Sequence, residues 1–154
     1  MRTTRRGGVR GCDAGKKIVG RKRHLLVDTD GLILKVRVHA ANVQDRDGAT
    51  LVLDQIDEPL SQLELIRADG GYAGKKLAGW MAERFGERPL LLEIVRRSDT
   101  QKGFAVLPRR WVVERTFGWL NNFRRLSKDY EFRTDSSKAF IFLAASLLLI
   151  ARLA

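Results

Sequence analysis

The chain has 154 residues, enough for one domain with a sizeable core, and its 29 lysines and arginines against 18 acidic residues give a formal net charge of +11. Residues 1–24 and 96–128 are strongly basic, whereas residues 25–95 carry more acids than bases. This segregation favours a polyanionic partner over a charge that serves solubility alone. The single cysteine, Cys12, excludes an intramolecular disulfide and a cysteine-rich zinc site.

The chain begins with an arm and a hairpin. Residues 1–23 are basic and rich in glycine, and because the first twenty show no periodicity we expect an irregular arm. Residues 25–27 and 32–39 predict two strands around a glycine-containing turn, with the second strand half buried. His39 lies on the polar side of that strand, and we expect a surface imidazole rather than a metal ligand.

Helices and strands then alternate. Capping residues at 42–47 precede a helical pattern that ends before Pro59, and further elements are predicted at 63–68 (strand), 75–85 (helix) and 90–95 (strand). A hairpin followed by this alternation predicts an α/β domain with a mixed sheet.

The stretch from Pro108 to Leu126 predicts an amphipathic helix packed on the core. Its apolar stripe comprises Val112, Thr116, Trp119, Phe123 and Leu126. Glu114 lies on the opposite face, together with Arg110, Gly118, Asn121 and Arg125. Taken alone, the position of Glu114 has a simpler explanation: it belongs to a solvent-exposed helix face and forms ordinary ion pairs there.

The last element is an apolar helix over Ala139–Ala151, which Ser136 and Ser137 can cap. Its thirteen residues are too few to cross a bilayer, and charged residues close it on both sides. We therefore expect a buried terminal helix and no membrane partner.

Asp69 directly follows the predicted strand at 63–68, and Gly70 and Gly71 come next. Glycines let a ligand approach the backbone closely, although Asp-Gly-Gly is also a common turn. An Asp at a strand tip and a Glu on a later helix can converge, and two or three such carboxylates hold Mg²⁺. Metal ions held in this way catalyse phosphodiester displacement, so Asp69 and Glu114 are candidate ligands as a pair.

Five blocks of the chain resemble the DDE transposases of the bacterial insertion-sequence-five group, within the insertion-sequence-four/five superfamily. These are Gly20–His24 (GRKRH), Ala41–Asp45 (ANVQD), Ala68–Tyr72 (ADGGY), Arg110–Phe117 (RWVVERTF) and Arg124–Glu131 (RRLSKDYE). The resemblance implies a ribonuclease-H-like mixed sheet flanked by helices. It also implies that Asp69 is the second catalytic acid, that Glu114 is the third, and that Mg²⁺ or Mn²⁺ is the cofactor.

The chain departs from the family pattern at its start. The family's first catalytic Asp belongs to the first, central strand, just before the stretch aligned with residues 1–4. We therefore expect that strand to be missing or reduced to a stub in this chain. We also expect this chain to contain none of the residues that serve as the first acid of the triad. Without that strand, two strand edges would stay unpaired and the isolated chain would be marginally stable. We therefore expect a single truncated catalytic domain over 1–154, with the arm at 1–23 and the core and terminal helix at 24–154.

The resemblance also implies partners. Residues expected to contact DNA are Arg21, Lys22, Arg23, Arg110, Arg124, Arg125 and Lys128. The expected function is DNA transposition by metal-dependent strand cleavage and transfer, with this chain inactive alone; the alternative is a non-catalytic repressor fragment that binds DNA or a transposase. Expected partners are double-stranded DNA (element ends and target) and either a second copy or a full-length transposase, in the bacterial cytoplasm near the nucleoid.

Overall fold

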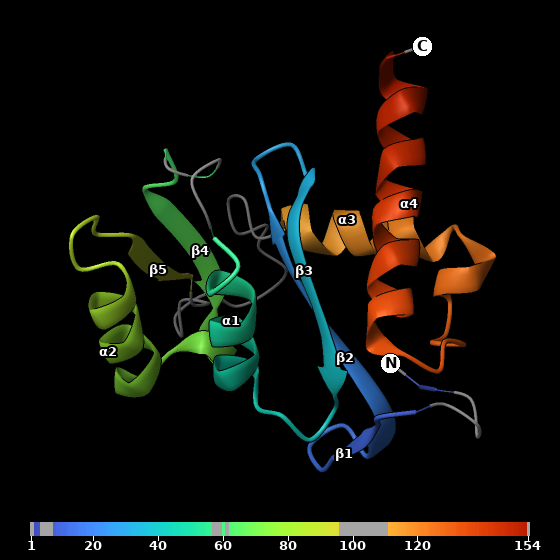
Figure 1. Ribbon diagram of the computed structural model, residues 1–154, viewed down its shortest axis with the longest axis horizontal. Coiled ribbons are helices and arrows are strands. Elements are labelled where there is room, and N and C mark those ends of the chain that lie inside the picture. Colours follow the sequence, from blue (N-terminus) through green and yellow to red (C-terminus); the bar gives the residue numbers. More distant parts are fainter. Residues whose placement is uncertain (1, 4–7, 57–59, 61, 96–110, 154) are drawn as a thin grey trace, which may run out of the picture. The chain divides into compact units, whose positions relative to one another are not determined.

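The computed structural model describes residues 2–3, 8–56, 60, 62–95 and 111–153. The chain divides into two compact units, residues 1–44 with 112–154 (unit 1) and residues 45–111 (unit 2) (Figure 1). Each unit has its own hydrophobic cluster, which gives each its own internal packing.

Unit 1 is built on an antiparallel sheet in the order β1-β2-β3. Its elements are β1 (Gly11–Asp13), β2 (Ile18–Val27), β3 (Ile33–Ala40), α3 (Trp111–Asn121), the short 3-10 helix η3 (Arg124–Leu126) and α4 (Thr134–Leu153). The hairpin β2–β3 is confirmed, with Leu25 opposite Val36. Val36 and Val38 are buried in a cluster with side chains of α3, η3 and α4, so the predicted half-buried second strand is correct.

The expected irregular arm is wrong over its second half, because β1 and the first part of β2 occupy it. The alternation of apolar and polar residues that marks a strand is not visible in this sequence, because cations occupy the core-facing positions Arg21 and Arg23 of β2. His39 is also not a surface residue. It is 8% exposed, and its ring stacks on that of His24 at 4.7 Å between centroids.

Unit 2 pairs two parallel strands and packs helices beside them. Its elements are α1 (Asp45–Leu53), β4 (Leu65–Asp69), the 3-10 helix η2 (Gly70–Tyr72), α2 (Lys75–Arg84) and β5 (Leu91–Val95). The core holds Ala49 and Leu53 of α1 against Leu77 and Met81 of α2. These elements confirm the predicted alternation.

Among the described residues the strands pair as β1-β2-β3 in unit 1 and as β4-β5 in unit 2. Within the described residues, β4 pairs on one edge only, with β5, and the edge of β2 opposite β3 is paired only at its Ile18–Gly20 end, with β1 and Arg2. An unpaired strand edge presents backbone donors and acceptors that another strand can satisfy. The α/β class is confirmed, and the ribonuclease-H-like mixed sheet stays a prediction.

Two boundaries differ near the C-terminus. α3 ends at Asn121, so Phe123 and Leu126 lie beyond the helix and Leu120, instead of Trp119, is its buried residue there. Likewise Arg125 belongs to η3 and does not continue the face of Glu114.

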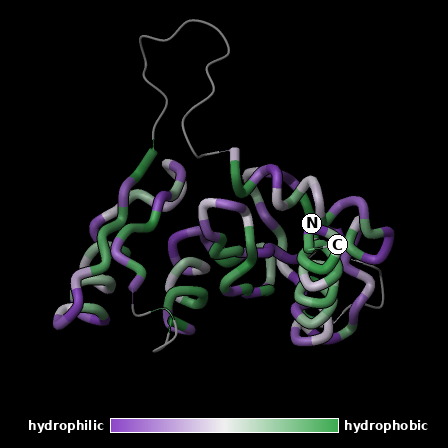
Figure 2. The backbone as a smooth tube through the Cα atoms, turned by 90° about the horizontal axis from the view of Figure 1, so that it is seen from above, coloured by the Kyte–Doolittle hydropathy of each residue, from purple (hydrophilic) through white to green (hydrophobic). Residues whose placement is uncertain are grey.

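α4 is longer than the apolar segment that predicted it. Its 20 residues make it long and apolar enough to cross a membrane by length and composition, so the length argument was wrong (Figure 2). One such helix is weak evidence of a span, and Ser137, Ile141 and Ala144 of α4 are buried against the rest of unit 1. Only 17% of its apolar stretch is buried, and Leu143, Leu147 and Ile150 are exposed, so the prediction of a buried terminal helix holds only for the face that packs on unit 1.

Candidate functional site

Asp69 is the last residue of β4 and caps the N-terminus of η2. Its Oδ1 accepts a hydrogen bond of 2.8 Å from the Gly71 N–H, which fixes the carboxylate over the turn while the residue stays exposed. A Cβ added to Gly70 would meet nothing within 4 Å, so space is open beside the acid. The predicted position of Asp69 at the end of a strand is confirmed.

Asp45, in the first turn of α1, is a neighbour that the sequence analysis missed. A Cβ at Gly71 would lie 3.0 Å from an Asp69 oxygen and 3.5 Å from an Asp45 oxygen, so both carboxylates flank one glycine. Burial raises the pKa of Tyr72, and the charges of these two acids raise it further, so this phenol stays protonated. Asp45 lies inside the ANVQD block, where its position after Asn42 suggested only a helix cap.

Glu114 is exposed in the first turn of α3, on the face opposite the buried residues Val112 and Thr116. Gly118 lies one turn further along α3, and a Cβ added there would meet nothing within 4 Å. There is therefore open space on this part of the helix. Asp69 belongs to unit 2 and Glu114 to unit 1, so their convergence remains a prediction.

The hairpin turn of unit 1 holds α3 in place. Arg115 Nη2 donates to the Asp30 carbonyl at 2.8 Å, and the Thr116 hydroxyl lies 3.0 Å from the Gly31 carbonyl oxygen. Gly31 has φ +85°, and a Cβ there would lie 2.8 Å from Thr116 Oγ1 and 3.0 Å from the Trp119 ring. Only glycine suits this contact, so the turn fixes the helix that carries Glu114.

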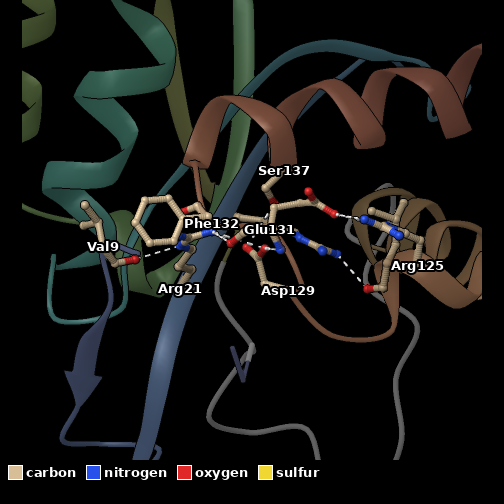
Figure 3. A network of polar contacts seen from close by, with 9 residues as sticks. Val9, Arg21, Arg125, Asp129, Glu131, Phe132 and Ser137 are labelled. Atoms are coloured by element: carbon tan, nitrogen blue, oxygen red, sulfur yellow. Dashed lines mark hydrogen bonds and ion pairs between the residues drawn. The ribbon is translucent and has the colours of Figure 1, made fainter. Parts of the chain in front are cut away.

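Arg21 is not a DNA contact in this structure, because its side chain is fully buried. Nη1 lies 3.2 Å from the Asp129 carboxylate, which is also fully buried, and the guanidinium donates to the carbonyl oxygens of Val9, Glu131 and Phe132 (Figure 3). Every charged contact described for Arg21 is internal, so it joins β2 to the segment before α4.

The two neighbouring cations also make internal contacts. Lys22 Nζ donates to the Val43 carbonyl at 2.9 Å and lies 3.6 Å from an Asp13 oxygen. Arg23 Nη1 donates to the Leu126 carbonyl at 3.0 Å. Burial lowers the pKa of Arg23, and the charge of Asp129 partly offsets this. All three cations of the GRKRH block therefore make contacts within unit 1.

The remaining predicted DNA contacts are exposed or undescribed. Arg124, Arg125 and Lys128 are exposed in and just after η3, so they are available for a contact with DNA. Arg110 lies outside the described residues. Among the described residues, no group of three or more His, Cys, Asp or Glu lies together as a metal site would require. Asp69 and Glu114 are both exposed, and exposed cations lie around η3.

Comparison with known proteins identifies the family. The family described as "Transposase DDE domain" matches residues 1–149. Over 136 residues the chain is 32% identical to a Burkholderia cepacia protein that is provisionally assigned as the transposase for insertion sequence element IS402. That alignment covers 84% of this chain and 62% of the relative, so the chain spans less than two thirds of the relative's length. No solved structure matches the chain significantly. The extent of the family match shows that the chain belongs to the DDE transposases of insertion sequences.

Proposed function

We propose that this chain is part of a transposase catalytic domain in which Asp69 and Glu114 act together on DNA phosphodiester bonds. The observation that carries the proposal is the family match, which spans both acids, at positions where unit 2 exposes one at a strand end and unit 1 exposes the other on a helix. We also infer the ribonuclease-H-like arrangement that the resemblance implies, because that arrangement gives a strand-tip Asp and a later helical Glu a common site.

The two acids suit a divalent ion. Carboxylate oxygens are the ligands that Mg²⁺ and Mn²⁺ prefer, and both side chains are exposed. The Gly71 N–H orients Asp69, and the hairpin turn fixes the helix of Glu114. When bound, the ion supplies Lewis acidity and lowers the pKa of a bound water. Asp45 would add negative charge beside Asp69 and favour a cation there.

The proposed partner is double-stranded DNA, both element ends and target, held by phosphate contacts from Arg124, Arg125 and Lys128. Exposed cations on one short segment form such a surface without reading base sequence. A second copy or a full-length transposase is the proposed protein partner, and the bacterial cytoplasm is the proposed location.

A titration of labelled duplex DNA against salt tests this function. We expect affinity to fall steeply with salt, and the slope of log Kd against log salt to drop by about 0.9 for each of the three cations replaced by Ala. Arg84→Ala, in an exposed ion pair of α2, serves as the control and should change the slope little.

The same titration with Mg²⁺ at constant ionic strength tests the metal. We expect Mg²⁺ to tighten binding and Asp69→Asn to remove the gain, because an ion held by Asp69 would add positive charge that attracts the DNA phosphates. A DNA affinity that depends on salt but does not change with Mg²⁺ would favour the non-catalytic repressor instead. Salt-insensitive binding would contradict both functions.

A further inference from the structure

Arg125 is held in one orientation although most of its side chain is exposed. Its Nε and Nη2 lie 3.0 Å and 2.9 Å from Oε1 of Glu131 (Figure 3). Its guanidinium also lies over the Phe140 ring, 4.9 Å from the centroid. The Arg125 side chain is 60% exposed and that of Glu131 only 16%. A largely exposed cation is therefore attached to a mostly buried carboxylate.

Glu131 is itself fixed by the buried network of unit 1. Its carbonyl oxygen accepts from Arg21 Nη1 at 2.9 Å, and its N–H donates to Asp129 Oδ1 at 3.2 Å. The second oxygen of Asp129 accepts from the Ser137 hydroxyl at 2.9 Å. Exposed ion pairs usually contribute little because two flexible side chains must be ordered, but here the backbone of the acid is fixed and its side chain is mostly buried.

We propose that Glu131 is a positioning residue that presents Arg125 to a DNA phosphate; this inference rests on the proposed DNA binding. With Nε and one edge of Nη2 directed at Glu131, the Nη1 edge of the planar guanidinium remains for a phosphate oxygen. An arginine already held on a carboxylate and a ring loses less conformational entropy when it binds.

Glu131→Ala separates this inference from a purely electrostatic effect, because the two predict changes in DNA affinity of opposite sign. Simple electrostatics predicts tighter DNA binding when a carboxylate beside the basic surface is removed. The positioning role predicts that Glu131→Ala weakens binding about threefold to tenfold, because Arg125 loses its orientation. Asp135→Ala, which removes an exposed carboxylate from α4, is the matched control and should leave binding unchanged or tighten it.

A double-mutant cycle with the full chain completes the test, using fluorescence anisotropy with duplex DNA and thermal unfolding as the check of folding. Glu131→Ala should cost nothing further in an Arg125→Ala background, whereas its effect should add to that of Arg124→Ala. If Glu131→Ala does not fold, Arg125→Lys replaces it, and it should bind nearly as weakly as Arg125→Ala because lysine lacks the planar fork.

Unchanged or tighter binding by Glu131→Ala, full additivity with Arg125→Ala, or parental binding by Arg125→Lys would each overturn the inference. Failure of the DNA-binding function looks different, because Ala substitutions at Arg124, Arg125 and Lys128 would then leave DNA affinity unaltered.

Discussion

Replacing Asp129 by Asn is expected to lower the free energy of unfolding by about 3–5 kcal/mol, the usual cost of removing one partner from a buried ion pair. The variant keeps the side-chain volume but leaves the fully buried Arg21 cation without its carboxylate. Because Asp129 also bonds Ser137 and the Glu131 N–H, the join between β2 and α4 should loosen. Urea unfolding followed by circular dichroism measures the change.

Asp135→Asn is the matched control for this stability measurement. Asp135 pairs with Arg133 at 3.6 Å, and both side chains are about three-quarters exposed, at 76% and 75%. Its loss should change the free energy of unfolding by less than about 0.5 kcal/mol. Equal effects of the two substitutions would show that the buried pair does not hold unit 1 together.

Glu114→Gln is expected to abolish DNA cleavage and strand transfer by a transposase that contains this chain. Gln lacks the anionic oxygen with which Glu114 would bind a divalent ion. Changes to residues that only support metal ligands lower activity by up to about 100-fold, so loss of a ligand itself should lower the cleavage rate by more than that. Asp69→Asn should lose as much for the same reason. The rate of strand cleavage on a labelled element end, with Mg²⁺, measures the effect.

Glu83→Gln, an exposed carboxylate of α2, is the control for that assay and should cut like the parent. A Glu114→Gln protein that cuts as fast as the parent would refute the assignment of the third acid. Because Gly118 leaves space beside Glu114, this substitution is not expected to disturb the packing of α3.

The sequence predicted the elements whose pattern follows burial directly. α2 and β5 lie close to their predicted limits, because apolar spacing and flanking Gly or Pro both mark them. It also placed Asp69 at a strand end and Glu114 on an exposed helix face, since each needs only local periodicity.

The missed features depend on contacts between distant residues. Cations at core-facing positions of β2 hid a strand, and the burial of Arg21 is compensated by Asp129, more than a hundred residues away. His39 is buried by stacking on His24 across the hairpin, and Asp45 comes beside Asp69 only when α1 packs near η2. Periodicity within one segment carries no information on such pairs.

Iron-mediated cleavage of the purified chain tests most directly whether Asp69 and Glu114 share one divalent ion. Fe²⁺ binds oxygen-rich Mg²⁺ sites, and with ascorbate and peroxide it produces hydroxyl radicals that cut the backbone close to the ion. We expect cuts around both Asp69 and Glu114, both suppressed by excess Mg²⁺ and both lost in Asp69→Asn. Cleavage confined to one of the two segments, or unchanged by Asp69→Asn, would contradict the shared site.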